Sequence, residues 1–170
     1  KLRSVTFNGN EAISSSKLQE QMELQPDSWW KLWGNKFDGS QFDKDIQAIQ
    51  DYYQNNGYAK ARVTKTDVQL NEEHTKADVT IDVSEGEKYN LSSARIVGNL
   101  GGMADELQPL LGELHLNDTF SRADVQNVES LIKDKLGERG YGSATVNTVP
   151  TFDDANKTLA LTFVVDAGRR

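Results

Sequence analysis

The fold is decided by Asn55-Asn56-Gly57-Tyr58-Ala59-Lys60-Ala61-Arg62-Val63, because a close relative of this stretch returns as Glu138-Arg139-Gly140-Tyr141-Gly142-Ser143-Ala144-Thr145-Val146. In both places a helical run meets a glycine, the residue that enters the left-handed conformation at a helix C-terminus without a Cβ penalty. A tyrosine follows and opens an alternating segment, which predicts a strand. The chain is therefore predicted to contain two copies of one unit.

Two further sequence marks repeat in the same order. Phe7-Asn8-Gly9-Asn10 matches Ile96-Val97-Gly98-Asn99, and Val83-Ser84-Glu85-Gly86 matches Val165-Asp166-Ala167-Gly168. The matched glycines lie 89, 83 and 82 positions apart in chain order, so the first copy holds about six extra residues between its first two marks. We expect one repeat at 1–88 and a second at 89–170, with a loop insertion in the first.

Composition narrows the classes of function. The net charge of −7 is spread evenly, since residues 1–88 hold 11 Lys and Arg against 15 Asp and Glu, and residues 89–170 hold 8 against 11. Without a basic stripe, nucleic acid is not expected as a partner. The chain has no cysteine, and no apolar run approaches the roughly 18 residues of a membrane span. Because it opens inside a strand pattern and stops just after another, we expect a segment of a longer protein.

The periodicity predicts the elements of the first copy. Alternation over Leu2–Phe7 predicts a strand, and Ser14–Ser16 offer caps for a short helix with Leu18 buried. A long helix follows, with one apolar stripe and with Asp43 and Asp45 among its polar positions. The stripe consists of Phe42, Ile46, Ile49 and Tyr53.

A hairpin closes each copy. In the first copy a strand after Gly57 turns at 71–76 into a strictly alternating strand over Val79–Val83. In the second copy the strands are predicted at about Gly142–Phe152 and Thr158–Val165. The prediction is an α+β fold of two tandem β-α-α-β-β units. Each is a three-stranded mixed sheet in the order 1-3-2, covered on one face by two helices.

The second strand of each copy is predicted to lie at the edge of its sheet. The apolar positions of the first copy change phase along this strand, which predicts a β-bulge near Thr64 to Asp67. In the first copy, charged residues protect this edge from unwanted pairing with other strands. In the second copy, Pro150 does so. The charged residues are Lys60, Arg62 and Lys65. An unpaired edge accepts a peptide strand, so we expect partners along Lys60 to Val68.

All three tryptophans of the chain lie in the predicted insertion. Trp29, Trp30 and Trp33 either fold back over the helices and enlarge a small core, or form a second, weaker partner-binding patch. The sequence leaves both interpretations open.

No arrangement of residues predicts catalysis, a cofactor or a metal site. His74 and His115 lie in different copies, and neither has a second metal ligand at helical or turn spacing. Gly98-Asn99-Leu100-Gly101-Gly102 lacks the ending of a phosphate-binding loop and is interpreted as a turn. We therefore expect a binding protein and not an enzyme.

The tandem β-α-α-β-β plan resembles the POTRA repeat over the whole chain. The resemblance rests on the glycine-asparagine after strand one, Gly-Tyr before strand two and the acidic-glycine ending after strand three. Trp29-Trp30, Asp51-Tyr52-Tyr53 and Gly57-Tyr58-Ala59 are similar to the third repeat of the outer-membrane-protein assembly factors of Gram-negative bacteria. Gly98-Asn99-Leu100 with Gly140-Tyr141 is similar to the fourth.

This resemblance implies a function and a location. It implies a non-enzymatic segment on the periplasmic face of the outer membrane, part of a larger outer-membrane protein. Its partners would be unfolded outer-membrane proteins, bound by strand addition, and accessory lipoproteins, with a β-propeller lipoprotein at the first, bulged repeat. The edge residues expected to bind are Lys60, Ala61, Arg62, Val63, Thr64, Lys65 and Thr66. A POTRA segment of a related translocation or two-partner secretion transporter is the alternative.

Overall fold

The computed structural model describes residues 2–24, 39–73 and 75–170. They form two compact units, Lys1–Gln54 with Lys60–Gly86, and Asn55–Ala59 with Glu87–Arg170. The order of the main elements is β1, α1, α2, β2, β3 and then β4, α3, α4, β5, β6. The predicted tandem α+β fold is therefore confirmed.

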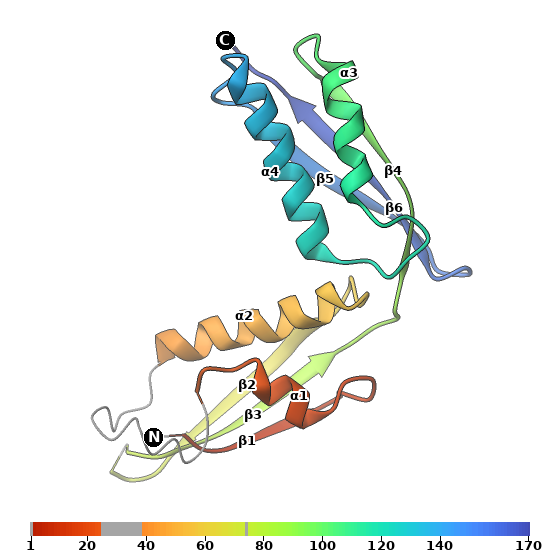
Figure 1. Cartoon of the computed structure of the whole chain (residues 1–170). Coiled ribbons are helices and arrows are strands. Elements are labelled where there is room, and N and C mark those ends of the chain that lie inside the picture. Colours follow the sequence, from red (N-terminus) through yellow and green to blue (C-terminus); the bar gives the residue numbers. More distant parts are fainter. Residues whose placement is uncertain (1, 25–38, 74) are drawn as a thin grey trace. The chain divides into compact units, whose positions relative to one another are not determined.

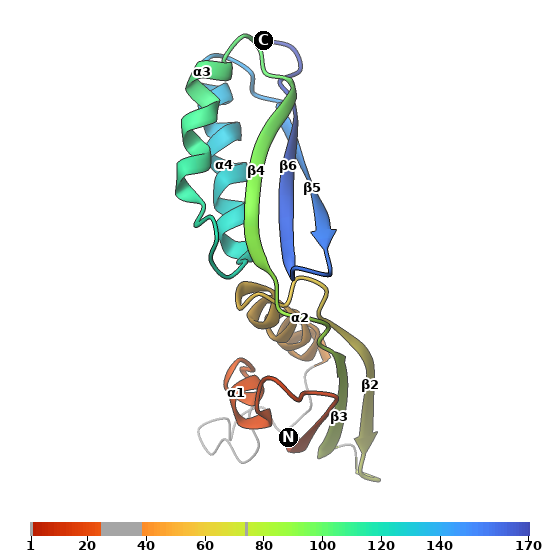
Figure 2. The same cartoon turned by 90° about the vertical axis from the view of Figure 1, so that its right-hand side faces the viewer.

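The first unit has both of its helices on one side of its sheet (Figures 1 and 2). The sheet order is β1-β3-β2, with β1 parallel and β2 antiparallel to β3, as predicted. The elements are β1 (Leu2–Asn8), α1 (Ser15–Glu20), α2 (Gly39–Asn55), β2 (Arg62–Leu70) and β3 (Ala77–Ser84).

The second unit repeats this layering, with α3 and α4 over one face of the sheet (Figures 1 and 2). Its sheet order is β4-β6-β5, and the outer strands are again parallel and antiparallel to the central one. The elements are β4 (Asn90–Asn99), α3 (Ala104–Leu107), the 3₁₀ helix η2 (Gln108–Glu113), α4 (Arg122–Glu138), β5 (Thr145–Asp153) and β6 (Thr158–Asp166).

The core of the first unit lies between its helices and the inner face of its sheet. Ser14 caps α1 by accepting a hydrogen bond from the Lys17 N–H, and Leu18 one turn later is fully buried. Every second residue of β3 is buried, as expected for a central strand covered on one face. The predicted stripe of α2 is buried at Phe42, Ile49 and Tyr53, while Ile46 is half-buried.

The predicted starts of the second strands were wrong by a few residues. The strands begin at Arg62 and Thr145, and not directly after the tyrosines. Gly57 and Gly140 have φ angles of +96° and +92°, as the helix-ending glycines require. A tight turn then intervenes in each copy, closed in the first by the Ala59 N–H donating to the Gly57 carbonyl at 3.0 Å. Alternation alone does not distinguish such a turn from the first residues of a strand.

Asp45, expected among the polar positions of the long helix outside its apolar stripe, is buried. Asp45 is only 1% exposed. Its carboxylate accepts hydrogen bonds from the backbone N–H groups of Glu23 (2.9 Å) and Leu24 (3.0 Å) and from the Gln41 side chain (2.9 Å). A buried carboxylate is tolerated when its oxygens are bonded in this way, so Asp45 fastens the chain after α1 onto α2.

Candidate functional site at the edge of the first sheet

Strand β2 is an edge strand, and most of the predicted binding residues lie on it. Arg62, Thr64, Lys65 and Thr66 are exposed, and Val63 is half-buried. Two predicted members lie outside the strand. Lys60 and Ala61 precede it, and Ala61 is 2% exposed, so its side chain belongs to the core and not to a binding surface.

The predicted bulge is present at the start of its predicted range. The pairing of β2 with β3 shifts between Val63 and Lys65, which leaves Thr64 as the extra residue. The Thr64 hydroxyl donates to the Asp82 carbonyl on β3 at 3.2 Å, so the side chain helps to satisfy the interrupted ladder. The bulge is therefore a stabilised feature of this edge.

The phase of the ladder shows which backbone groups of β2 face away from the sheet. The Asp82 carbonyl faces β2, because it accepts the Thr64 hydroxyl. In an antiparallel pair, alternate residues point toward the partner strand, so Thr80 and Asp78 also face β2. Their partners Asp67 and Gln69 point inward. The residues between these pairs then direct their backbone groups outward, and they are Thr66, Val68 and Leu70.

Two glutamines of α2 cover the beginning of this edge. The Val63 N–H donates to Gln50 Oε1 at 2.9 Å. The Gln54 side-chain amide donates to the Ala61 carbonyl at 3.3 Å. Periodicity could not have found these contacts, because glutamines four positions apart on a helix read as part of a solvated face. Among the residues that the structure describes, these two side chains cover the predicted edge before the bulge, and no such cover is seen after it.

The second sheet protects its edge differently. Strand β5 pairs with β6 without a register shift from Thr145 to Asp153. Pro150 lies on this strand and has no N–H to offer. The Thr148 hydroxyl, two residues earlier, donates to Glu129 of α4 at 2.8 Å. This edge is a poorer template for an added strand than the edge of the first sheet.

Glu85, directly after β3, holds one end of the first unit, and its role was not predicted from the sequence. Its carboxylate accepts hydrogen bonds from the N–H groups of Glu11 (2.9 Å), Ala12 (3.0 and 3.1 Å) and Ile13 (3.3 Å) and from the Tyr53 hydroxyl (2.7 Å). Partial burial alone would raise the pKa of Glu85, but these hydrogen bonds together outweigh it and hold the pKa below its ordinary value. The glutamate therefore fixes the loop that follows β1.

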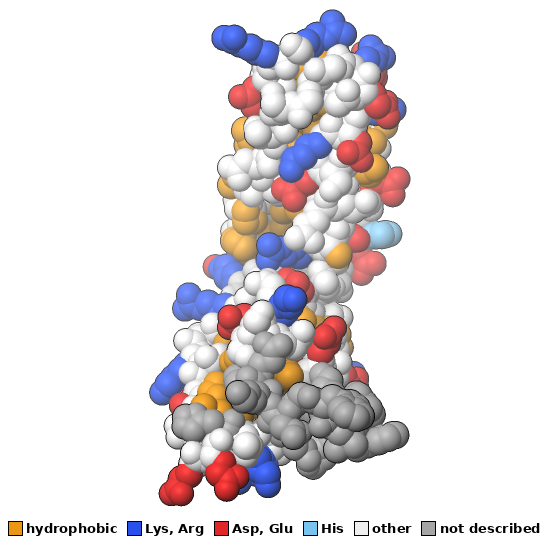
Figure 3. Space-filling model, turned by 90° about the vertical axis from the view of Figure 1, so that its left-hand side faces the viewer, with side chains coloured by type: hydrophobic (Ala, Val, Ile, Leu, Met, Phe, Trp, Pro, Cys, Tyr) orange, Lys and Arg blue, Asp and Glu red, His pale blue; other side chains and the backbone are white. Residues whose placement is uncertain are grey.

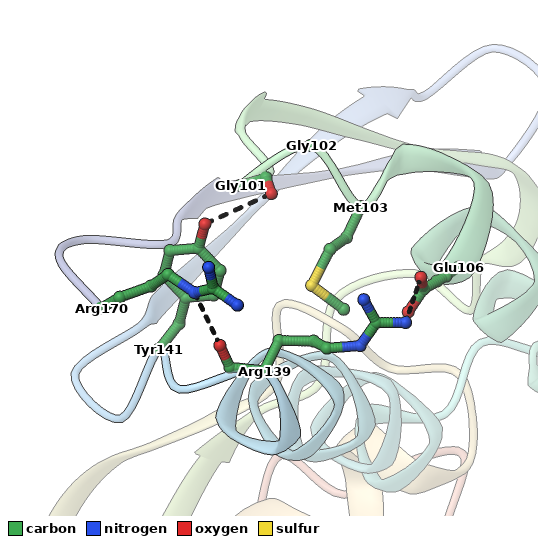
Figure 4. A pocket seen from close by; sticks show the side chains of 7 residues that line it. All are labelled: Gly101, Gly102, Met103, Glu106, Arg139, Tyr141 and Arg170. Carbon is green, nitrogen blue, oxygen red and sulfur yellow. Dashed lines mark hydrogen bonds and ion pairs between the residues drawn. The ribbon is translucent and has the colours of Figure 1, made fainter.

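A pocket of about 230 Å³ lies at one end of the second unit (Figure 4). Its two guanidinium groups already have partners within the unit. Arg139 pairs with Glu106 at 2.8 Å, while Arg170 donates to the Arg139 carbonyl at 3.0 Å and lies over the Tyr141 ring. The Tyr141 hydroxyl donates to the Gly101 carbonyl at 3.3 Å. These internal contacts give the pocket a structural role in holding the loop after β4.

Other features contribute no site among the residues that the structure describes. In these ranges no group of three or more histidines and acids is placed to hold a metal ion. No described helix is both long and apolar enough to cross a membrane. Basic and acidic side chains are interspersed on the face shown in Figure 3. The three tryptophans of the predicted weaker patch lie outside the described residues, as does His74.

The chain belongs to the POTRA family. The family described as "Surface antigen variable number repeat" matches residues 1–86 and again residues 89–168. Two matches in one chain agree with the duplication inferred from the glycine marks.

The relatives of this chain are outer-membrane assembly factors. It is 30% identical over its full length to "Outer membrane protein assembly factor BamA" of Neisseria meningitidis and 29% identical to that of Buchnera aphidicola. It spans only 22% and 28% of those proteins. It is also similar to the crystal structure of Haemophilus influenzae BamA POTRA3-5, with 75% identity, a TM-score of 0.91, all of this chain covered and 67% of the other. The predicted resemblance to BamA POTRA repeats is confirmed.

Proposed function

We propose that this chain is a periplasmic segment of an outer-membrane-protein assembly factor, and that it binds unfolded outer-membrane polypeptides along the β2 edge. The 75% identity to a BamA segment over the whole chain carries this proposal. The same identity favours an assembly factor over the related translocation and two-partner secretion transporters. The whole protein would be anchored in the outer membrane, with these repeats on its periplasmic side.

The chemistry of the β2 edge suits a client of varied sequence. Outward-facing N–H and C=O groups pair with any extended chain, so affinity comes from the backbone and depends little on side chains. After the bulge these groups belong to Thr66, Val68 and Leu70, as the ladder phase indicates. The backbone groups of Lys65 and Asp67 face β3, so they maintain the pairing between β2 and β3. A client strand therefore has about five residues of edge, Thr66 to Leu70, on which to pair.

An accessory lipoprotein is the second candidate partner of the first unit. The bulge at Thr64 favours it, because the resemblance associates a bulged second strand in the third repeat with a β-propeller lipoprotein. The exposed Lys65 beside the bulge and the three tryptophans of the insertion are further candidates for that contact. Client and lipoprotein would compete if both use β2.

Proline substitution on the outward positions tests the proposal. Thr66→Pro and Val68→Pro remove an outward N–H without removing a ladder bond to β3, so the fold should persist. Thr66→Val and Val68→Thr keep the N–H and serve as matched controls. We expect the proline variants to lose the backbone amide shifts that peptides from outer-membrane β-barrel strands induce along β2 in an NMR titration, while the controls keep them.

Each outcome of this titration is informative. Unchanged peptide binding by a folded proline variant would refute strand addition on β2. Shifts confined to 145–153 would move the client site to the second unit. If a parallel titration shows that the proline variants no longer bind a purified lipoprotein while they still bind the peptides, β2 is the lipoprotein site.

A further inference from the structure

The backbone of the first sheet's edge is occupied at one end by side chains of the same unit. Gln50 and Gln54 lie one turn apart on α2 and reach the same short segment before the bulge. Gln50 supplies an acceptor to the Val63 N–H at 2.9 Å, and Gln54 supplies a donor to the Ala61 carbonyl at 3.3 Å. Donor and acceptor are thus matched to the two kinds of backbone group that an added strand would use.

We propose that these two glutamines act as an internal cover that sets the register and length of the bound strand. While the cover is in place, a client pairs only from Thr66 onward. To pair across the bulge as far as Ala61, it must first displace both amides. This inference rests on the proposed function of β2 and adds the residues that limit where a client pairs.

The chemistry of a primary amide suits a cover of this kind. A glutamine side chain carries both a carbonyl acceptor and an N–H₂ donor, so it imitates a peptide group. The two bonds are partly buried, and each contributes only a modest net free energy because a peptide can make equivalent bonds in its place. The cover therefore keeps the edge satisfied when empty and yields to a strand that makes equivalent bonds.

The second copy of the unit supports a role specific to the first. Counting 83 residues from Gly57 to Gly140 places Lys133 and Gly137 at the positions of the two glutamines. Neither residue has a side-chain amide. That copy has Pro150 on its edge strand instead, which removes a donor permanently. A side-chain cover is reversible and a proline is not, so only the first copy is built for an edge that opens.

Hydrogen exchange in the free protein tests the contact itself, independently of any client. The Val63 amide should be protected in the unmodified chain, and Gln50→Met should reduce its protection at least about tenfold, since the acceptor is lost. Gln47→Met is the matched control, because Gln47 lies on the same helix and its side-chain amide donates to Asp51 at 2.9 Å and not to the β2 edge. An unprotected Val63 amide in the unmodified chain would overturn the inference.

Peptide binding then tests the function of the cover. In the double variant Gln50→Met and Gln54→Met, we expect the amide shifts caused by a β-barrel strand peptide to extend back to Ala61–Val63, and its affinity to rise roughly 2- to 10-fold for each bond freed from competition. An unchanged footprint and affinity, or a footprint that already reaches Ala61 in the unmodified chain, would overturn the inference. Absence of shifts at Thr66–Leu70 in both proteins would instead refute the proposed function, while the Val63 protection would still report on the contact.

Discussion

Replacing Glu85 with glutamine should destabilise the first unit, and the loss should depend on pH. The carboxylate accepts from three backbone N–H groups and the Tyr53 hydroxyl, at 2.7 to 3.3 Å. Glutamine retains one acceptor oxygen, but its N–H₂ then faces groups that are themselves donors. Hydrogen bonds to a charged group contribute about 1.5–3 kcal/mol each. Because Glu85 is only half-buried and water replaces part of what is lost, we expect a decrease of about 2–4 kcal/mol in the free energy of unfolding at pH 7.

The pH dependence follows from the lowered pKa of Glu85. A carboxyl group whose pKa is lower in the folded state stabilises the fold fully above its unfolded pKa, which is about 4.3 for glutamate. That contribution is lost as the pH falls through the lower folded value. The difference between the unmodified protein and Glu85→Gln should therefore be largest near neutral pH and should shrink below about pH 4.

Urea unfolding followed through the backbone amide NMR signals of residues 39–54 and 62–84 provides the assay. These signals come from residues of one compact unit, so they report on its unfolding separately from that of the other unit. Glu72→Gln is the matched control, because Glu72 is an exposed glutamate of the same unit and its replacement should change the free energy of unfolding by less than about 0.5 kcal/mol. A loss for Glu85→Gln no larger than that of the control, or a difference that stays constant between pH 7 and pH 3.5, would refute the reasoning.

Three further predictions concern single residues. Asp45→Ala should lower the free energy of unfolding by about 2–4 kcal/mol, because it leaves partly buried donors without their acceptor. Asp43→Ala, on the exposed side of α2, should change it by less than about 0.5 kcal/mol. Urea unfolding compares the two variants. Gly98→Ala should destabilise the second unit, measured by thermal unfolding in circular dichroism, because a Cβ at this φ of +104° would lie 2.2 Å from a carbonyl oxygen of β6. The pKa of Asp78 should be about 2, lowered mainly by hydrogen bonds from Arg3 and Ser4, and Arg3→Gln should raise it toward its ordinary value in a carboxyl-carbon NMR titration.

The sequence predicted what depends on local geometry. Paired glycines located both helix ends, and alternation identified the central strands. The change of apolar phase along β2 located the bulge, since an extra residue shifts every later side chain to the other face. These features are visible because each is a property of neighbouring residues in one chain segment.

The sequence did not predict contacts whose partners lie far along the chain. Asp45 has the spacing of a solvated helix residue, yet its partners are backbone groups 21 and 22 residues earlier. Glu85 bonds a loop 72 to 74 residues before it. Gln50 and Gln54 bond backbone groups at and just before the start of β2, and a backbone group has no sequence signature. Polar residues that bond distant backbone are therefore the part of a site that pattern reasoning misses.

Some residues have the same role in both copies and are required by the fold, whereas others differ between the copies. Gly9 and Gly98 both have positive φ and both lie against a carbonyl of the central strand, so that position is required by the fold itself. Glu85 and Tyr53 fall at the positions of Ala167 and Leu136, so one copy closes this end with a hydrogen bond and the other with apolar packing.

The edges differ in a way that core stability does not require. Both copies bury an alternating central strand, and both leave their second strand at the edge. One edge has a bulge and removable glutamines, whereas the other has a continuous register and a proline. Since either arrangement is compatible with the same fold, we infer that the difference reflects what each edge meets outside its own unit. The double variant Val68→Pro and Pro150→Thr moves the edge proline from the second repeat to the first. If the edge alone determines where a client binds, strand addition should move from the first repeat to the second. If the client stays on the first repeat after the exchange, the site is determined by residues other than the edge.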